Sequence, residues 1–482
     1  MPNYWMVVVI RRNATLLLVS LLPLLSAQDI VWLKRYDTGS PEHPANGVLD
    51  LSGNLIICGV TGDYGNHDVT LIKYNPGGET LWVRTYDSGG DDLGASCAVG
   101  SDGGVVVGIS RHPAPCLLLK YDQEGRFLWN KQFQVGSYCY VGGVVIDDSL
   151  NIYLSGTTAI SSILYSNLLL AKFTPLGESV WMRIYDCGKQ ENGGQILLLP
   201  DGDICGCGNF DDDREWLFDL LICKFQGDGD TCWIRILNVK PQDEAYGITA
   251  DSECNLYITG DVYEDWGQGI VQPDSFVTAR YQPDGTLDWV RVDGLSHYSW
   301  GEAIGFDPSG QLLVAGGCYD SILNESSGAI LCYSLDGTLL WHWTYRQENQ
   351  NCWFTDIVIA EPGVCYVIGE VANADYDSSD FLVLKLRYPV GVAEGRPAEV
   401  PAGDISPATM VCAGATLRFS VAGAGDYRLV VRDVSGQERL VYAGYLARGE
   451  NRLSLPSLPA GVYFLDLAGA GVQRRHRLVV VR

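Results

Sequence analysis

Tryptophan recurs through most of this chain every 47 to 56 residues, and this period limits what the chain can fold into. A turn that carries glycine precedes each tryptophan after the first, and five of its glycines are Gly125, Gly177, Gly229, Gly285 and Gly337. A fixed period of this length is typical of a repeat architecture in which each unit is one supersecondary element. The seven recurring residues are Trp32, Trp82, Trp129, Trp181, Trp233, Trp289 and Trp341.

Each repeat consists of short apolar runs separated by turns. One run ends in glycine, as in 151–156 and 255–260, and the next ends in a basic residue followed by an aromatic one, as in Lys172 and Phe173. The glycine turn follows, and the last run begins at the tryptophan. With one more strand upstream, the repeat holds four strands and shows no helical periodicity, which indicates the blade of a β-propeller.

The number of strands predicts how the ring closes. Seven sets of the first three strands are present, the last over 355–386, but only six of them are followed by a tryptophan strand. The missing strand is the isolated run 30–36 at the start. We therefore predict an all-β fold, a seven-bladed β-propeller over 28–390, whose last blade takes its outer strand from the N-terminal end, because this closure leaves no open blade edge.

These repeats resemble those of bacterial seven-bladed β-propeller proteins, which are often secreted. The glycine turn with its tryptophan also resembles the docking motif of pyrroloquinoline-quinone propellers. Those enzymes have eight blades and need a quinone and metal site, for which the sequence offers no residues.

The first 27 residues have the order of a secretory signal peptide. Arg11 and Arg12 precede an apolar run over 14–25, and small residues follow at 26–27. The alternative is a membrane anchor, but the run is shorter than the roughly 20 residues that a spanning helix needs. We expect export, signal removal and a mature chain without a transmembrane span.

The charge balance changes near residue 390. The whole chain has a formal net charge of -25, whereas 391–482 contains 11 arginines, no lysine and 8 acidic residues. The acidic surplus argues against nucleic acid as a partner, because phosphate binding needs a basic face. A stretch rich in Pro, Gly and Ala over 391–405 has the composition of a linker, so 406–482 is predicted as a second domain.

Six short predicted strands within 406–482 indicate a small immunoglobulin-like β-sandwich. Its last two strands resemble the sorting motif of type IX secretion domains, and the residues that carry the resemblance are Gly461, Tyr463, Leu478, Val480 and Arg482. The resemblance implies recognition by the type IX secretion machinery and a final location that is extracellular or on the outer cell surface. The alternative is a terminal immunoglobulin-like binding module.

The recurring tryptophans allow two interpretations. Because they recur in every blade, we expect inter-blade packing rather than ligand stacking, with buried indoles and positive φ at the turn glycines. Replacement of Trp181 or Trp233 by alanine would then cost about 3 to 5 kcal/mol. A basic residue two positions after most of these tryptophans is expected to protect the outer strand, the alternative being a ligand-binding ring.

The sequence contains no motif that assigns chemistry. Its six histidines are dispersed, and neither a zinc-protease motif nor a serine-hydrolase motif occurs. We expect no cofactor. Acidic clusters at 91–92, 211–213 and 375–380 leave structural calcium open against solvated loops. The 15 cysteines are expected to be mostly buried free thiols, with a cross-strand disulfide such as Cys318 with Cys332 left open.

The functional hypothesis is accordingly a secreted or cell-surface propeller without catalytic activity that binds an extracellular polymer or protein. The alternative is a secreted hydrolase or lyase with its active site on the axial face of the propeller. A propeller assembles such a site from several blades and leaves no local motif.

Overall fold

The computed structural model describes residues 29–390, apart from 64, 112–114, 160–165, 188–189, 212–217, 264–274, 297, 322–323 and 374–377. Beyond these it describes the strands between 410 and 481. The chain divides into two compact units at Val390 and Gly391. The predicted signal peptide (1–27) and linker (391–405) lie outside the described residues.

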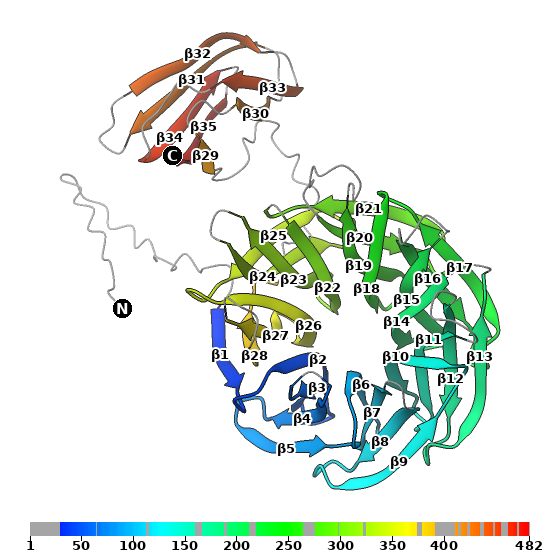
Figure 1. Cartoon of the computed structure of the whole chain (residues 1–482). Helices are drawn as coiled ribbons and strands as arrows, with labels where there is room; N and C mark the ends of the chain where they lie inside the picture. Colours follow the sequence, from blue (N-terminus) through cyan, green and yellow to red (C-terminus); the bar gives the residue numbers. More distant parts are fainter. Residues whose placement is uncertain are drawn as a thin grey trace, which may run out of the picture. The chain divides into compact units, whose positions relative to one another are not determined.

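The first unit is a seven-bladed β-propeller, as predicted, and its described residues form no helix (Figure 1). Each blade is a four-stranded antiparallel sheet, whose strands we call a to d from the central channel outward. Blades 1 to 3 consist of β2 (Glu42–Leu49), β3 (Leu55–Thr61), β4 (Asp68–Tyr74), β5 (Thr80–Tyr86), β6 (Asp92–Val99), β7 (Val105–Arg111), β8 (Cys116–Tyr121), β9 (Phe127–Phe133), β10 (Tyr138–Ile146), β11 (Ile152–Ala159), β12 (Ser166–Phe173) and β13 (Ser179–Tyr185).

The remaining blades continue this order around the ring. Blades 4 to 6 consist of β14 (Gln190–Leu198), β15 (Ile204–Asp211), β16 (Phe218–Phe225), β17 (Thr231–Leu237), β18 (Gln242–Ala250), β19 (Leu256–Tyr263), β20 (Ser275–Tyr281), β21 (Leu287–Asp293), β22 (Tyr298–Asp307), β23 (Gln311–Asp320), β24 (Glu325–Ser334) and β25 (Leu339–Tyr345). Blade 7 contains β26 (Asn351–Glu361), β27 (Val364–Ala372), β28 (Ser379–Arg387) and β1 (Asp29–Tyr36).

The two ends of the propeller meet in blade 7. Strand β1 runs antiparallel to β28, with Ile30 opposite Leu386 and Tyr36 opposite Phe381. This is the predicted closure, and it confirms that the isolated N-terminal run is the outer strand of the last blade. Because β1 occupies the edge of blade 7, the backbone of β28 finds hydrogen-bond partners on both sides.

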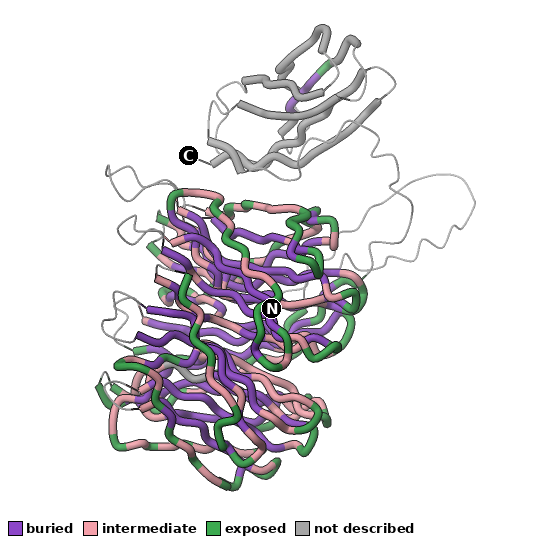
Figure 2. The backbone as a smooth tube through the Cα atoms, turned by 90° about the vertical axis from the view of Figure 1, so that its right-hand side faces the viewer, coloured by how far each residue is buried: buried purple, intermediate pink, exposed green. Residues whose placement is uncertain are grey.

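The apolar core lies between the blades. Strands b and c are buried along nearly their whole length, because each face packs on a neighbouring blade (Figure 2). One cluster joins Ile56 and Leu71 of blade 1 to Val105 and Leu119 of blade 2. Each such side chain contributes about 1.5 to 3 kcal/mol when it is buried, so the contacts between blades supply much of the stability.

In six of the seven blades, a glycine near the middle of the b strand allows the inner strand to bulge. In blade 5, Ala245 pairs with Gly260 and Gly247 pairs with Thr259, so Tyr246 is an extra residue of β18. A Cβ at Gly260 would collide with the carbonyl oxygen of Glu244. The same collision with the inner strand would occur at Gly156, Gly208 and Gly316. Only glycine fits here, which explains why this position recurs in the sequence.

The second unit, described by itself, consists of two sheets. The predicted strands are present, with an added short strand at its start and boundaries that shift by up to five residues. A five-stranded sheet contains β29 (Met410–Cys412), β35 (Val472–Val481), β34 (Gly461–Gly469), β31 (Gly425–Asp433) and β32 (Glu438–Leu446). The other sheet pairs β30 (Thr416–Val421) with β33 (Gly449–Ser454).

No helix among the described residues is long and apolar enough to cross a membrane.

Candidate functional site

The repeated tryptophans contact the glycine turn of the following blade. A Cβ on each of these glycines would come within 2.7 to 3.2 Å of the indole ring or of the basic residue beside it. The pairs are Trp32 with Gly78, Trp82 with Gly125, Trp129 with Gly177, Trp181 with Gly229, Trp233 with Gly285, and Trp289 with Gly337. All of these glycines have positive φ, from 74° to 91°.

The indoles are half-buried rather than fully buried. They lie on the outermost strand of each blade, where the ring packs against the glycine turn of the next blade. Trp233 donates from Nε1 to the carbonyl oxygen of Pro283 at 3.1 Å. Trp341 departs from the pattern because β28 of blade 7 does not continue through a turn into its outer strand, which is β1. Its ring packs near Tyr388 instead, at 6.0 Å between centroids.

The basic residues after the tryptophans bind the same turns. Arg235 Nε donates to the carbonyl oxygen of Gly285 at 3.0 Å, and its guanidinium lies 5.4 Å from the centroid of Trp233. Arg84 and Arg291 make the equivalent bond to Gly125 and Gly337. These contacts join neighbouring blades at the outer wall and leave the repeat residues away from the channel.

The residues of the sorting motif lie opposite one another in the second unit. Gly461 pairs with Val480, and Tyr463 pairs with Leu478, in the ladder between β34 and β35. Arg482 lies outside the described residues.

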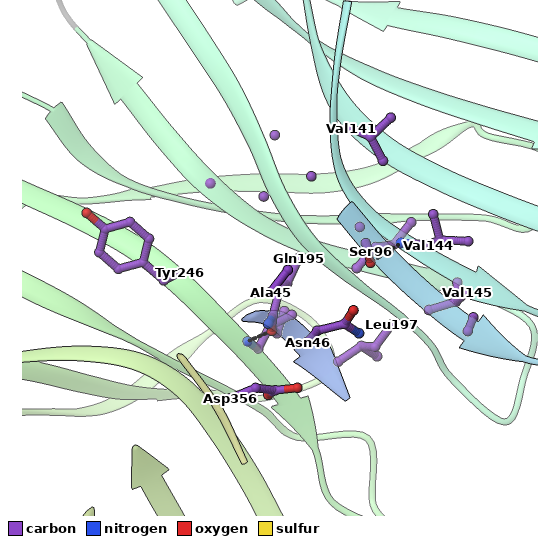
Figure 3. Close-up of a pocket in the computed structure, with 18 of the residues that line it drawn as sticks. Ala45, Asn46, Ser96, Val141, Val144, Val145, Gln195, Leu197, Tyr246 and Asp356 are labelled. Carbon is purple, nitrogen blue, oxygen red and sulfur yellow. Dashed lines mark hydrogen bonds between the residues drawn. The ribbon is translucent and has the colours of Figure 1, made fainter. Parts of the chain in front are cut away.

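A cavity of about 1210 Å³ lies in the centre of the propeller and is lined by the inner strands of all seven blades (Figure 3). Its two halves differ in chemistry. The first halves of β10, β14 and β18 contribute polar or aromatic residues such as Tyr138, Asn192 and Tyr246, whereas the second halves of β10 and β14 contribute apolar residues such as Ile146 and Leu198. We call the half with the polar residues the polar mouth. The last residues of the b strands lie at the same rim, because strand a begins where strand b ends.

The bulges form a ring around the channel. In five blades the extra residue or residues are small or uncharged, at Ala45, Gly94, Gly142, Gly194–Gln195 and Thr355. In the neighbouring blades 5 and 6 the extra residues are Tyr246 and Glu302. A bulge changes the direction in which a side chain points. Blades 5 and 6 therefore place a phenol and a carboxyl at the bulge position, where the other five blades have a small residue or an amide.

Tyr246 and Glu302 belong to a compact polar group. The Tyr246 hydroxyl donates to Glu244 Oε2 at 2.5 Å, and Gln242 Nε2 donates to Glu244 Oε1 at 3.0 Å. Burial, and then the negative charge of Glu244, raise the pKa of Glu302 to about 7. Burial and the nearby carboxylates of Asp261 and Glu244 raise the pKa of Tyr246 as well, so this phenol stays protonated and is not an activated nucleophile.

A second carboxyl of the channel is held by backbone. Asp356 Oδ2 accepts a hydrogen bond from Gly47 N at 2.7 Å, and Oδ1 accepts one from Ile357 N at 2.8 Å. Burial raises the pKa of Asp356 to about 6. The bond to Gly47 connects blades 7 and 1, so this carboxyl has a structural role.

Among the described residues that line the channel, none is Arg, Lys or His. The two histidines that the fold brings together lie elsewhere. The rings of His43 and His67 are 5.9 Å apart, and each ring contacts a carboxylate, Glu370 at 3.2 Å and Asp91 at 2.7 Å. The hydrogen bond that His43 donates to Glu370 raises the pKa of His43.

The structure separates the other candidates. Asp91 binds His67, and Asp375 and Asp377 are among the residues that are not described. The cysteines of the described propeller are free thiols and most are buried, as predicted. A bond between Cys318 and Cys332 is wrong, because Cys318 lies opposite Ser327 whereas Cys332 lies opposite Leu313.

The group around Tyr246 and Glu302 was missed from the sequence. The repeat search rested on strands b, c and d, whose tryptophans and glycines recur, whereas the inner strands share little. A signal was present in the spacing of two residues between Glu244 and Tyr246 and between Trp300 and Glu302. This spacing places the two members of each pair on the same side of an inner strand.

No known protein family and no curated protein matches the chain, whereas many solved structures share its fold. A polysaccharide lyase described as PL25 ulvan lyase has a TM-score of 0.51 at 8% identity, over 72% of this chain and 95% of its own. Polysaccharide lyase Uly1 has a TM-score of 0.49 at 12% sequence identity, over 72% of this chain and 90% of its own. The β-propeller domain of the trilobed protease from Pyrococcus furiosus has a TM-score of 0.42 at 8% sequence identity, over 74% of this chain and 98% of its own. At these identities the likeness shows the fold alone.

Proposed function

We propose that this protein is an exported propeller that binds a neutral, hydroxyl-rich ligand, such as a segment of a glycan, at the polar mouth of its central channel. The observation that carries this proposal is the pair of bulge residues, Tyr246 and Glu302, in neighbouring blades. Repeat units diverge from their common pattern where function demands it, and these two positions depart from a ring of mostly small residues.

The chemistry of the polar mouth suits such a ligand. Asn192, Tyr140 and Tyr246 supply amide and phenol groups that both donate and accept hydrogen bonds. Glu302, with its pKa near 7, donates as a carboxyl and accepts as a carboxylate around neutral pH. Aromatic walls with a few convergent polar groups are typical of small-ligand sites.

The charge of the channel selects against anionic polymers. Its described lining contains Glu302 and Asp356 and no basic side chain, so a uronate or sulfate group would enter an acidic channel without a counter-charge. A lyase that acts on a uronate needs to neutralise the substrate carboxylate, and this lining supports that chemistry poorly.

A glycan array with the purified mature chain tests the proposal. We expect neutral glycans among the hits, and we expect Tyr246→Ala or Glu302→Ala to weaken binding at least tenfold. Alanine already occupies this bulge at Ala45, so both variants should fold. Leu51→Ser, at an exposed turn at the other end of an inner strand, is the control. Equal binding by all three variants would refute the assignment.

A second candidate function is glycoside hydrolysis. A carboxyl with a raised pKa beside an ionised one is the arrangement that supplies a general acid and a base or nucleophile. Glu302, with its raised pKa, would be the acid, and Glu244, which accepts hydrogen bonds from Tyr246 and Gln242, is the neighbouring carboxyl. New reducing ends on incubation with the array hits, lost in Glu302→Gln while binding remains, would favour hydrolysis.

Export through the type IX secretion system forms the other part of the proposal. It rests on the signal-like N-terminal segment and on the motif shared by β34 and β35. Deletion of 406–482 should leave the propeller in the periplasm, and fractionation of cells that express both forms measures this. Normal export of the truncated chain would refute the sorting role and leave the proposal for the channel unaffected.

A further inference from the structure

Three carboxylates converge where the ring closes. Asp37 follows the N-terminal strand β1, Asp380 lies on the neighbouring strand β28 of blade 7, and Glu42 begins β2 of blade 1. One carboxylate oxygen from each lies within 4.8 Å of the others. Oxygen ligands lie about 2.3 to 2.6 Å from calcium, so two ligands on opposite sides of the ion are separated by roughly this distance.

Glu42 has an oxygen without a partner. The residue is 0% exposed. Its Oε1 accepts hydrogen bonds from the backbone N of Thr38, at 2.8 Å, and from the Thr38 hydroxyl. Its Oε2 is buried and contacts no hydrogen-bond donor among the described residues. A buried carboxylate oxygen without a partner costs free energy, which a bound cation would recover.

The charge of this group also leaves room for a cation. Arg35 forms an ion pair with Asp380 and donates from Nη1 to Gln350 Oε1 at 3.3 Å. One guanidinium among three carboxylates leaves two negative charges.

We propose that Asp37, Glu42 and Asp380 bind one calcium ion, which holds the N-terminal strand, the last blade and the first blade together. Carboxylates with flexible geometry suit calcium better than magnesium, which demands a small octahedral site. Water completes the coordination on the exposed side, where Asp37 lies. This inference is independent of the function proposed for the channel.

The next junction between blades provides a matched control. Asp87 occupies the position of Asp37, and each accepts a hydrogen bond at Oδ1 from the glycine two residues later. Asp92 occupies the position of Glu42 and also has a buried oxygen without a hydrogen-bond partner. It is one methylene shorter, however, and Arg111 Nε lies 3.5 Å from its Oδ1. Among the described residues, the carboxylates of this junction do not converge as the first three do.

Thermal unfolding of the full mature chain in EDTA and in millimolar calcium tests the proposal. We expect calcium to raise the melting temperature by about 5 °C, since a ligand at 100 times its Kd stabilises the folded state by a few kcal/mol. Calorimetric titration should find one calcium ion per chain, and magnesium should have a weaker effect.

Asp37→Asn should lose most of the calcium response and keep the melting temperature of the wild type in EDTA, because Asp37 is exposed. Asp87→Asn should keep the full response. If Arg35 alone neutralises the group, the wild type will show neither a shift nor binding, and this result overturns the proposal. An equal shift in Asp37→Asn overturns it as well, because the ion would then bind elsewhere.

Discussion

The indole of Trp82 in blade 1 lies directly against Gly125 in the turn of blade 2, and a Cβ on that glycine would come within 2.9 Å of the ring. Arg84 donates from Nε to the Gly125 carbonyl oxygen at 2.6 Å on the same surface. A glycine with φ of 74° and an indole from the preceding repeat therefore form one joint between two blades.

Gly125→Ala should destabilise the protein by about 2 to 4 kcal/mol, because it adds a steric collision to the strain of positive φ. Gly202→Ala separates the two effects. Gly202 has φ of 86°, and an added Cβ would meet nothing within 4 Å, so only strain of about 1 to 2 kcal/mol applies. Chemical denaturation measures the loss of unfolding free energy in each variant. Equal losses in Gly125→Ala and Gly202→Ala would contradict a tight contact between Trp82 and Gly125.

Trp233→Ala should cost about 2 to 3 kcal/mol, less than the 3 to 5 kcal/mol expected for a fully buried indole. The ring is half-buried, and its loss also removes the bond to Pro283 and the contact with Arg235. Ile236→Ala on the same strand, with a side chain that is 45% exposed, is the control and should cost under 1 kcal/mol. Binding to the array hits should be unchanged in both variants.

The free energy of unfolding should fall as the pH rises from about 4.5 to 7, because of the carboxyl group of Glu302. Its pKa is higher in the folded state, so the unfolded chain loses the proton first and unfolding becomes more favourable over this window. Glu302→Gln removes the effect and should gain on the order of 1 to 3 kcal/mol relative to the wild type between pH 4.5 and 8. Thr355→Ser, an uncharged change in the same cavity, should follow the wild-type profile in denaturation at several pH values. Parallel profiles for Glu302→Gln and the wild type would contradict the raised pKa.

Alkylation of the native protein should modify Cys187 and Cys232 first, because these thiols are exposed. Burial raises the pKa of Cys207 to about 12 and raises that of Cys223 as well, so neither forms a thiolate at pH 8. Peptide mass spectrometry after short exposure to iodoacetamide measures the order. Rapid labelling of Cys207, or its recovery as a disulfide, would contradict the buried thiol.

The architecture could be predicted from the sequence because its causes are local and repeated. Turn glycines need positive φ, b-strand glycines make room for a bulge, and each tryptophan contacts the turn of the next repeat. Such requirements recur at a fixed period, so they are visible in the chain as printed. The orphan run 30–36 revealed the closure because one strand was missing from an otherwise complete count.

The candidate site could not be predicted in this way. Tyr246 and Glu302 lie far apart in the sequence, and each is unremarkable within its own strand. They become neighbours in the ring because blades 5 and 6 are adjacent, and the bulges of β18 and β22 turn both toward the channel. The same holds for Asp37, Glu42 and Asp380, which the closure brings together from both ends of the propeller. The sequence alone determined the repeating contacts within and between blades, whereas the convergence of unrepeated side chains was decided by the closed ring, since only closure brings distant residues to one axis or one junction.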